Sequence, residues 1–442
     1  AFLSTLATFA AGFVVRPFGA LFFGRLGDLI GRKYTFMVTL LLMGGATFLI
    51  GCIPSYETIG FMAPVLILLL RLLQGLALGG EYGGAATYVA EHSPEGKRGF
   101  MTAWIQTTAT VGLFVSLLVI MGTRAALSAE DFDAWGWRVP FWVSILMVLV
   151  SYLIRKNMEE SPVFAKAKAA GKTSTNPLKE SFGKKLNFKF VLLALFGAVM
   201  GQGVIWYTGQ FYAMSFIEKT MNVDKEQVDS LMFIALMLGT PFFLVFGWLS
   251  DKIGRKWIMM AGMLIAIVSY RPIYENMYQT TNLANKVELS SSNSMVNNVN
   301  TVTTVYADST IQQEIQKTNP ANGAITSTKV LTINSKDKQT LIWLVFIQVL
   351  FVTMVYGPIA AFLVEMFPTK IRYTSMSLPY HIGNGVFGGL LPAVATYLAT
   401  NAKTAGKSDW YLEGLWYPIG VAAVCLLIGV IYINGKDKEI ND

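Results

Sequence analysis

The chain has 442 residues, of which 53% are hydrophobic and 14% are charged, and its mean hydropathy is +0.49. This composition excludes an ordinary soluble globular protein, because apolar stretches of about 20 residues, long enough to cross a bilayer, recur throughout. The net charge of +8 does not indicate nucleic-acid binding, since the basic residues cluster in short loops between these stretches, as the positive-inside rule predicts.

Eleven apolar stretches predict membrane-spanning helices. Strands of a membrane barrel would alternate apolar and polar residues, and these stretches do not. The predicted helices are 1–23, 34–53, 59–90, 101–123, 139–156, 189–217, 228–249, 257–273, 340–366, 374–399 and 412–434. They divide into an N-terminal bundle (1–156), a polar, lysine-rich cytoplasmic linker (157–188) and a C-terminal bundle (189–442).

A ten-residue motif occurs twice. Residues 24–33 read GRLGDLIGRK and residues 247–256 read GWLSDKIGRK, with seven identities at an offset of 223 residues. A second pair, EHSPEGKR at 91–98 and EMFPTKIR at 365–372, is offset by 274 residues. We infer an internal duplication. One helix precedes the motif-bearing helix in the second half and none does in the first, so we expect a twelfth helix before Ala1, absent from this chain.

Lysine and arginine assign the two sides of the membrane. The motif loops, the linker and the tail from 435 are rich in basic residues, whereas the short opposite loop 54–58 has none. We expect the basic set to be cytoplasmic.

The second half contains an insertion. Asp28 and Glu91 are 63 positions apart, whereas their counterparts Asp251 and Glu365 are 114 apart, which leaves 51 extra residues. Composition places them at 274–339, on the periplasmic side. Alternation at 301–310 and 326–333 predicts a small hairpin, and a mobile linker is an equal alternative.

Six segments together resemble the major facilitator superfamily, and within it the metabolite:proton symporter branch of bacterial inner-membrane transporters. They are RPFGALFFGRLGDLIGRK, RLLQGLALGGEYGGA, EHSPEGKRGF, AWGWRVPF, EESPVF and FPTKIRYTSMSLPYHIGNGVFGG. The resemblance implies an all-α membrane protein of two six-helix bundles, with eleven helices visible here, in the bacterial inner (cytoplasmic) membrane. The bundles would rock about a central substrate site that opens to each side alternately.

The charged residues of the repeated motifs predict a cytoplasmic gate. An aspartate near a helix end can pair with arginine or cap a neighbouring helix, and such bonds would hold the two bundles closed. A topology anchor is the alternative, but lysine and arginine alone would suffice for anchoring. The resemblance assigns to the gate Asp28, Arg32, Glu91, Arg98, Asp251, Arg255, Glu365 and Arg372.

Residues 71–84 carry the first candidates for proton chemistry. Arg71 and Glu81 lie in an otherwise apolar helix, where a charge is costly unless it faces a partner or a cavity. They are ten residues apart, so we expect each to pair with another helix. Glu81 is our first candidate for the proton site, and Arg71 is a candidate partner for an anion or a carboxylate. Gln74 and Tyr82 in the same helix are further candidates for the substrate or proton site. A structural ion pair is the alternative.

Further polar residues are suited to lining a cavity at mid-depth. Arg16 precedes Pro17 and could steer anions, join the gate, or snorkel to the surface. His381 could titrate, although an isolated histidine is more often a packing residue. The other candidates are Gln202, Tyr207, Gln210, Tyr356, Tyr380 and Asn384.

The sequence contains no P-loop, GxSxG, HExxH or paired CxxC motif, which indicates a secondary carrier rather than an enzyme. Cys52 and Cys425 lack metal-ligand spacing, and we expect no cofactor or metal. We predict a proton-coupled symporter of a small organic acid or related metabolite, whose ligands are substrate, protons and the bilayer. The alternatives are a symporter of a zwitterionic osmolyte such as proline or betaine, and a non-transporting subunit that docks a partner protein through 274–339.

Overall fold

The computed structural model describes residues 2–296, 299–318 and 325–433. Ten helical segments in these ranges, beginning at Arg32, are long and apolar enough to cross a membrane. A further helix, α1 (Phe2–Leu29), precedes them. Together they match the eleven predicted stretches. The first half continues with α2 (Arg32–Cys52), α3 (Tyr56–Ile59), α4 (Met62–His92), α5 (Arg98–Ala126), α6 (Ala129–Ala134), η1 (Gly136–Arg138) and α7 (Val139–Asn157).

The linker and the second half contain more broken helices. The linker holds α8 (Pro162–Ala169) and η2 (Lys179–Gly183). The next segment runs from Lys185 to Thr220 as α9 (Lys185–Ala194), η3 (Leu195–Val199), α10 (Met200–Tyr207), η4 (Thr208–Tyr212), α11 (Ala213–Ser215) and η5 (Phe216–Thr220). The remaining helices are α12 (Lys225–Gly239), α13 (Pro241–Ile253), α14 (Arg255–Thr280), η6 (Leu283–Asn285), α15 (Ser335–Tyr356), α16 (Ile359–Met366), η7 (Thr369–Ile371), α17 (Arg372–Ile382), η8 (Gly383–Gly388), α18 (Leu391–Thr404), η9 (Trp410–Leu415) and α19 (Trp416–Tyr432).

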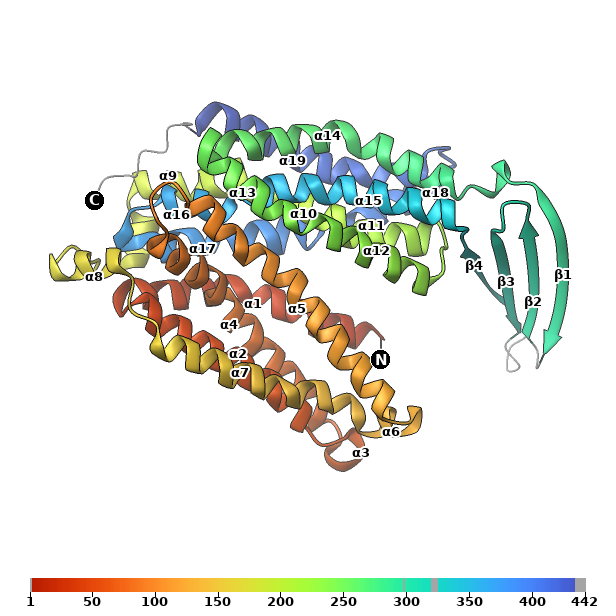
Figure 1. The fold of residues 1–442 in the computed structure, drawn as a ribbon, viewed down its shortest axis with the longest axis horizontal. Helices are drawn as coiled ribbons and strands as arrows, with labels where there is room; N and C mark the ends of the chain where they lie inside the picture. Colours follow the sequence, from red (N-terminus) through yellow and green to blue (C-terminus); the bar gives the residue numbers. More distant parts are fainter. Residues whose placement is uncertain (1, 297–298, 319–324, 434–442) are drawn as a thin grey trace.

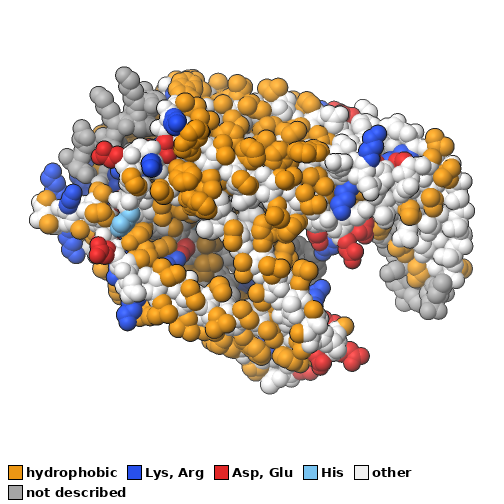
Figure 2. Space-filling model, in the orientation of Figure 1, with side chains coloured by type: hydrophobic (Ala, Val, Ile, Leu, Met, Phe, Trp, Pro, Cys, Tyr) orange, Lys and Arg blue, Asp and Glu red, His pale blue; other side chains and the backbone are white. Residues whose placement is uncertain are grey.

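The helices form two bundles that meet at the end near α8 and α9 and diverge toward the opposite end (Figure 1). Contacts between the bundles run from α1 and α4 to α17, and from α5 to α13 and α16. Figure 2 shows hydrophobic side chains over most of the long sides of both bundles, with charged side chains gathered toward the two ends. This distribution suits a protein embedded in a bilayer.

Both copies of the repeated motif turn through a glycine with positive φ. Gly31 (φ 143°) precedes α2 and Gly254 (φ 96°) precedes α14. A side chain in this region of φ is strained, which explains why glycine stands at both positions. At Gly31 an added Cβ would also lie 2.2 Å from Oε2 of Glu160.

The insertion is shorter than the predicted 274–339, because α14 continues to Thr280 and α15 begins at Ser335. The predicted helix ended near Pro272, where proline removes a backbone hydrogen bond. The helix continues through this proline, and Tyr274 and Met277 beyond it are fully buried against the C-terminal bundle. Their packing compensates for the lost hydrogen bond.

The insertion folds as a four-stranded antiparallel meander in the order β1-β2-β3-β4, rather than as one hairpin or a mobile linker. The strands are β1 (Glu288–Val296), β2 (Val299–Tyr306), β3 (Ile311–Thr318) and β4 (Ile325–Thr332). The predicted alternating segments correspond to β2 and β4. The strands β1 and β3 were not predicted, because they are polar sequences rich in serine and glutamine.

The sheet is attached to the C-terminal bundle through β4. The Leu331 N–H donates to the Asn222 carbonyl (2.7 Å), and the Asp224 N–H donates to the Leu331 carbonyl (2.9 Å). The side-chain amide of Gln227 accepts from the Ile333 N–H (2.8 Å) and donates to the Ile333 carbonyl (2.9 Å). These bonds join the sheet to the loop that precedes α12 and to the first turn of α12.

Candidate functional site

A carboxylate of the N-terminal bundle caps a helix of the C-terminal bundle. Asp28, fully buried near the end of α1, accepts from the backbone N–H groups of Tyr373 (3.3 Å) and Thr374 (2.8 Å) at the start of α17. Its other partner is Arg32, 3.2 Å away. Helix N-termini favour negative charge, so this cap joins the two bundles.

The second motif makes the reciprocal contact. Asp251 of the C-terminal bundle accepts from the N–H groups of Gly99 and Phe100, both at 2.8 Å, at the start of α5. Arg255 pairs with Asp251 (2.8 Å) and with Glu365 (2.7 Å). The duplication therefore produces two equivalent interbundle caps, one from each half.

Glu91 joins the remaining cytoplasmic charges. Its carboxylate lies 2.9 Å from Arg372 of the other bundle and 3.5 Å from Arg32. The Ser161 hydroxyl also donates to it. Arg98 begins α5, beside the residues that Asp251 caps. The predicted gate residues thus lie together at the end where the two bundles meet.

The ring of Tyr373 fills a glycine-lined socket in the N-terminal bundle. A Cβ at Gly27 would lie 2.1 Å from this ring, and one at Gly84 would lie 2.5 Å from its hydroxyl. The hydroxyl donates to the Gly80 carbonyl at 2.6 Å. The glycines therefore permit the close approach of α1 and α4 to α17.

A cluster of tyrosines lies where the two bundles meet, at mid-depth. Tyr82 of α4 stacks on Tyr380 of α17, with ring centroids 3.6 Å apart and planes inclined by 6°. The hydroxyls of Tyr380 and Tyr356 are 2.5 Å apart, and Gln106 of α5 donates to the Tyr82 hydroxyl at 2.9 Å. Four helices from both bundles thus contribute to one hydrogen-bonded group.

Arg16 adds a cation to this cluster. Its guanidinium lies within electrostatic range of Tyr207, Tyr356 and Tyr380, and of the buried His381. Of the functions weighed for Arg16, steering of anions is the one that this position suits best. The Nε2 atom of His381 has no hydrogen-bond partner among the described residues.

Two amides lie behind the tyrosines. Gln202 and Asn384 donate to each other's carbonyl oxygens at 3.1 and 3.2 Å, and Asn384 also donates to the Tyr380 carbonyl (3.0 Å). Asn384 lies in the π-helical segment η8, and Gln210 lies half-buried in the π-helical segment η4. Such segments re-aim side chains and are frequent at functional sites.

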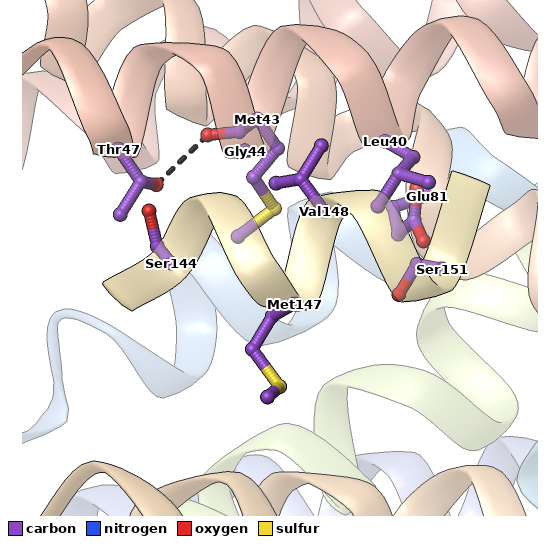
Figure 3. A pocket seen from close by; sticks show the side chains of 9 residues that line it. All are labelled: Leu40, Met43, Gly44, Thr47, Glu81, Ser144, Met147, Val148 and Ser151. Atoms are coloured by element: carbon purple, nitrogen blue, oxygen red, sulfur yellow. Dashed lines mark hydrogen bonds between the residues drawn. The ribbon is translucent and has the colours of Figure 1, made fainter. Parts of the chain in front are cut away.

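Glu81 lies apart from this cluster, inside the N-terminal bundle. It pairs with Arg155 of α7 at 2.5 Å and accepts from the Thr39 hydroxyl of α2 at 2.6 Å. It also lines a pocket of about 190 Å³ between α2 and α7, to which Ser144 and Ser151 contribute (Figure 3). As expected, Glu81 pairs with another helix.

The expectation that Arg71 pairs with another helix was wrong. Its guanidinium donates to Gln74 of the same helix at 3.2 Å, and Gln74 donates to Thr47 of α2 at 2.7 Å. The contact with α2 is therefore indirect, because the amide of Gln74 lies between them. Sequence reasoning also missed Arg155, Gln106 and Glu160 as partners.

Two helical bundles joined by charge contacts at one end, with a polar cluster where they meet, define a multi-pass membrane transporter and not an enzyme. The Major Facilitator Superfamily profile matches residues 2–274, and the chain belongs to this family. Among the described residues, no group of three or more His, Cys, Asp or Glu side chains could hold a metal ion.

Relatives and solved structures agree with this assignment. A putative metabolite transport protein of Haemophilus influenzae is 30% identical over 453 residues, covering 99% of this chain and 86% of the relative. The proline/betaine transporter of Escherichia coli is 29% identical over 441 residues, covering 97% of this chain and 74% of the relative. The fold resembles that of the proton:xylose symporter XylE, with a TM-score of 0.65 and 14% identity over 97% of this chain and 86% of that one.

Proposed function

We propose that the protein is a proton-coupled symporter of a small organic acid or related metabolite, which works by alternating access in the bacterial inner membrane. The observation that carries the proposal is the tyrosine cluster where the bundles meet, in which the Tyr356 and Tyr380 hydroxyls are 2.5 Å apart and the Arg16 guanidinium lies within electrostatic range of both. A guanidinium and a tyrosine hydroxyl can each donate a hydrogen bond to a carboxylate, which suits an acid ligand.

The proposed transport cycle uses both contact regions. With the cytoplasmic caps formed, the substrate enters from the periplasmic side, where the bundles diverge (Figure 1). Inward opening then requires the Asp28 and Asp251 caps to break and the stack of Tyr82 on Tyr380 to separate. The tyrosine cluster is therefore both the substrate site and the last contact between the bundles.

Glu81 is the proposed proton carrier. Its carboxylate forms an ion pair with Arg155 of α7 at 2.5 Å, and loss of the carboxylate charge would release Arg155. A purely structural ion pair remains the alternative. The adjacent Tyr82 provides the link to the substrate site, because its ring belongs to the cluster.

The second candidate is a zwitterionic osmolyte. A carboxylate on Arg16 and an ammonium group over the ring faces of Tyr82 and Tyr380 would satisfy both of its charges. The naming of a relative as a proline/betaine transporter supports this candidate. The third candidate, a subunit that docks a partner, would require the sheet at 288–332.

Uptake into proteoliposomes tests these proposals. We expect an inward proton gradient to drive accumulation of an organic acid, and a protonophore to abolish it. Accumulation of proline or betaine instead would establish the osmolyte candidate. Failure to transport any compound, together with a partner protein that co-purifies until residues 287–332 are replaced by a short linker, would favour the docking candidate.

Two variants test the residue assignments in the same assay. Arg16→Gln should raise the KM for the acid at least tenfold, whereas Arg124→Gln, at the exposed end of α5, should leave it unchanged. Glu81→Gln should transport without response to the proton gradient. Unchanged pH-driven accumulation in Glu81→Gln would exclude its proton role.

A further inference from the structure

A groove of about 420 Å³ lies between α9 and the end of α19 on the outer face of the C-terminal bundle. Two lysines, Lys185 and Lys189, line it together with apolar and aromatic side chains. The latter include Leu192, Phe196, Ile428 and Tyr432. The groove therefore combines a basic part with an apolar part.

The basic part lies at the cytoplasmic surface of the membrane. Helix α9 follows the lysine-rich linker, and α19 ends at Tyr432 on the same side. From Lys185 to Phe196 the helix rises about 16 Å, at about 1.5 Å per residue. This is close to half of the ~30 Å hydrocarbon thickness, so the groove is about as long as the acyl region of one leaflet.

The two lysines carry uncompensated charge. Neither ammonium has an ion pair or a hydrogen bond among the described residues, and both side chains are exposed. The preceding residue, Lys184, is different because it pairs with Glu180 at 3.1 Å. Lys185 and Lys189 are four residues apart in a helix, so they lie on the same face and can contact one anion.

We propose that this groove binds one anionic phospholipid of the cytoplasmic leaflet. The phosphate group lies between Lys185 and Lys189, and an acyl chain follows Leu192 and Phe196 toward the middle of the membrane. The Tyr432 ring borders the chain at the interface, where aromatic side chains are favoured. Basic pockets at the cytoplasmic ends of membrane helices are suited to anionic headgroups. This site is separate from the substrate cluster.

Lipid binding to the purified, delipidated full chain, measured by native mass spectrometry, tests the proposal. We expect phosphatidylglycerol to bind about 25-fold more tightly than phosphatidylcholine with the same acyl chains, at about fivefold for each lysine. The Lys185→Gln/Lys189→Gln variant should lose this preference, whereas Lys184→Gln, the matched control at the residue before α9, should keep it. Leu192→Trp, which fills the apolar part, should weaken the binding of both lipids.

Three outcomes would overturn the proposal. They are equal binding of the two lipids by the unmodified chain, the same loss in the Lys184→Gln control, and binding of inorganic phosphate as tight as that of phosphatidylglycerol. A variant that ends at Ile433 should bind phosphatidylglycerol as the full chain does. Tighter binding after this truncation would show that the C-terminal tail, rather than a lipid, occupies the groove. Unfolding temperatures confirm that each variant is folded.

Discussion

Tyr82 and Tyr380 stack almost parallel, 3.6 Å between ring centroids, although they belong to different halves of an internally duplicated chain. Each hydroxyl is held by a further partner, Gln106 for Tyr82 and Tyr356 for Tyr380. This stack is an aromatic contact between two bodies that separate in the proposed transport cycle. Its strength therefore affects how readily the bundles part at mid-depth.

Removing the ring and removing the hydroxyl should have different effects. Tyr380→Leu abolishes the stack, and we expect kcat/KM for uptake to fall at least tenfold because the substrate site loses an aromatic wall. Tyr380→Phe keeps the ring and loses the bond to Tyr356, so a fall of about fivefold is expected, equivalent to about 1 kcal/mol. Equal effects of the two variants would show that the stack contributes nothing beyond the hydroxyl.

The two interbundle caps should control the balance between inward-facing and outward-facing states. Asp28→Asn and Asp251→Asn each weaken a charge-assisted cap, and we expect each to favour the inward-facing state by about 1 kcal/mol. Spin labels on the cytoplasmic ends of the bundles would report the change as an increased population of long distances.

The matched control for this prediction is Asp224→Asn. Asp224 caps α12 within a single bundle, through the N–H groups of Glu226 and Gln227. Its replacement should lower the unfolding temperature without changing the label distances. If the control changes the distances as much as Asp28→Asn does, the caps do not act as a gate.

The Glu81–Arg155 pair can be tested with a double-mutant cycle. Glu81→Gln leaves the largely buried Arg155 without its carboxylate, and we expect a loss of about 2 kcal/mol in the free energy of unfolding. Adding Arg155→Gln should restore part of this loss. If the double variant also transports with full pH-driven accumulation, the pair is structural and the proton is carried elsewhere.

The attachment of the sheet should weaken in acid. Burial raises the pKa of Asp308, but hydrogen bonds from Lys286 and Thr310 outweigh it and lower the pKa to about 2, from an ordinary 3.8. A lowered pKa in the folded state means that the stabilisation is complete above about pH 4 and is lost as the pH falls toward 2. Hydrogen exchange of the sheet amides should therefore accelerate below pH 4.

The raised pKa of Lys286 sets the alkaline limit of the pH range in which the attachment of the sheet is stabilised. Burial lowers its pKa, but its hydrogen bonds to Asp308 and Asp337 more than offset this and raise it above 10.5. Its contribution is thus present below pH 10.5 and is lost only as the pH rises through this higher value. Asp308→Asn should remove the dependence of amide exchange between pH 2 and 4. An unchanged dependence would mean that other carboxylates control the attachment.

The sequence predicted the helices and the charged residues, such as Asp28 and Asp251, that join the two bundles, because apolar length and an internal repeat are strong local signals. It did not predict which residues pair. Glu81 and Arg155 are 74 positions apart, and only the packing of both α4 and α7 against α2 brings them together. The cluster around Tyr380 was predicted as separate polar residues. Its Gln106 was missed because an amide in an apolar helix has no distinctive spacing.

The four-stranded sheet has its described anchors in one bundle only, at Asn222, Asp224 and Gln227 and at Asp337 of α15. Any rotation of the C-terminal bundle must therefore carry the sheet with it. A small antibody fragment raised against the sheet would give a fiducial mark outside the membrane. In images of single particles, the orientation of this fragment relative to a label on α6 would report the relative movement of the two bundles during the transport cycle. Neither the fragment nor the label would contact the substrate pathway.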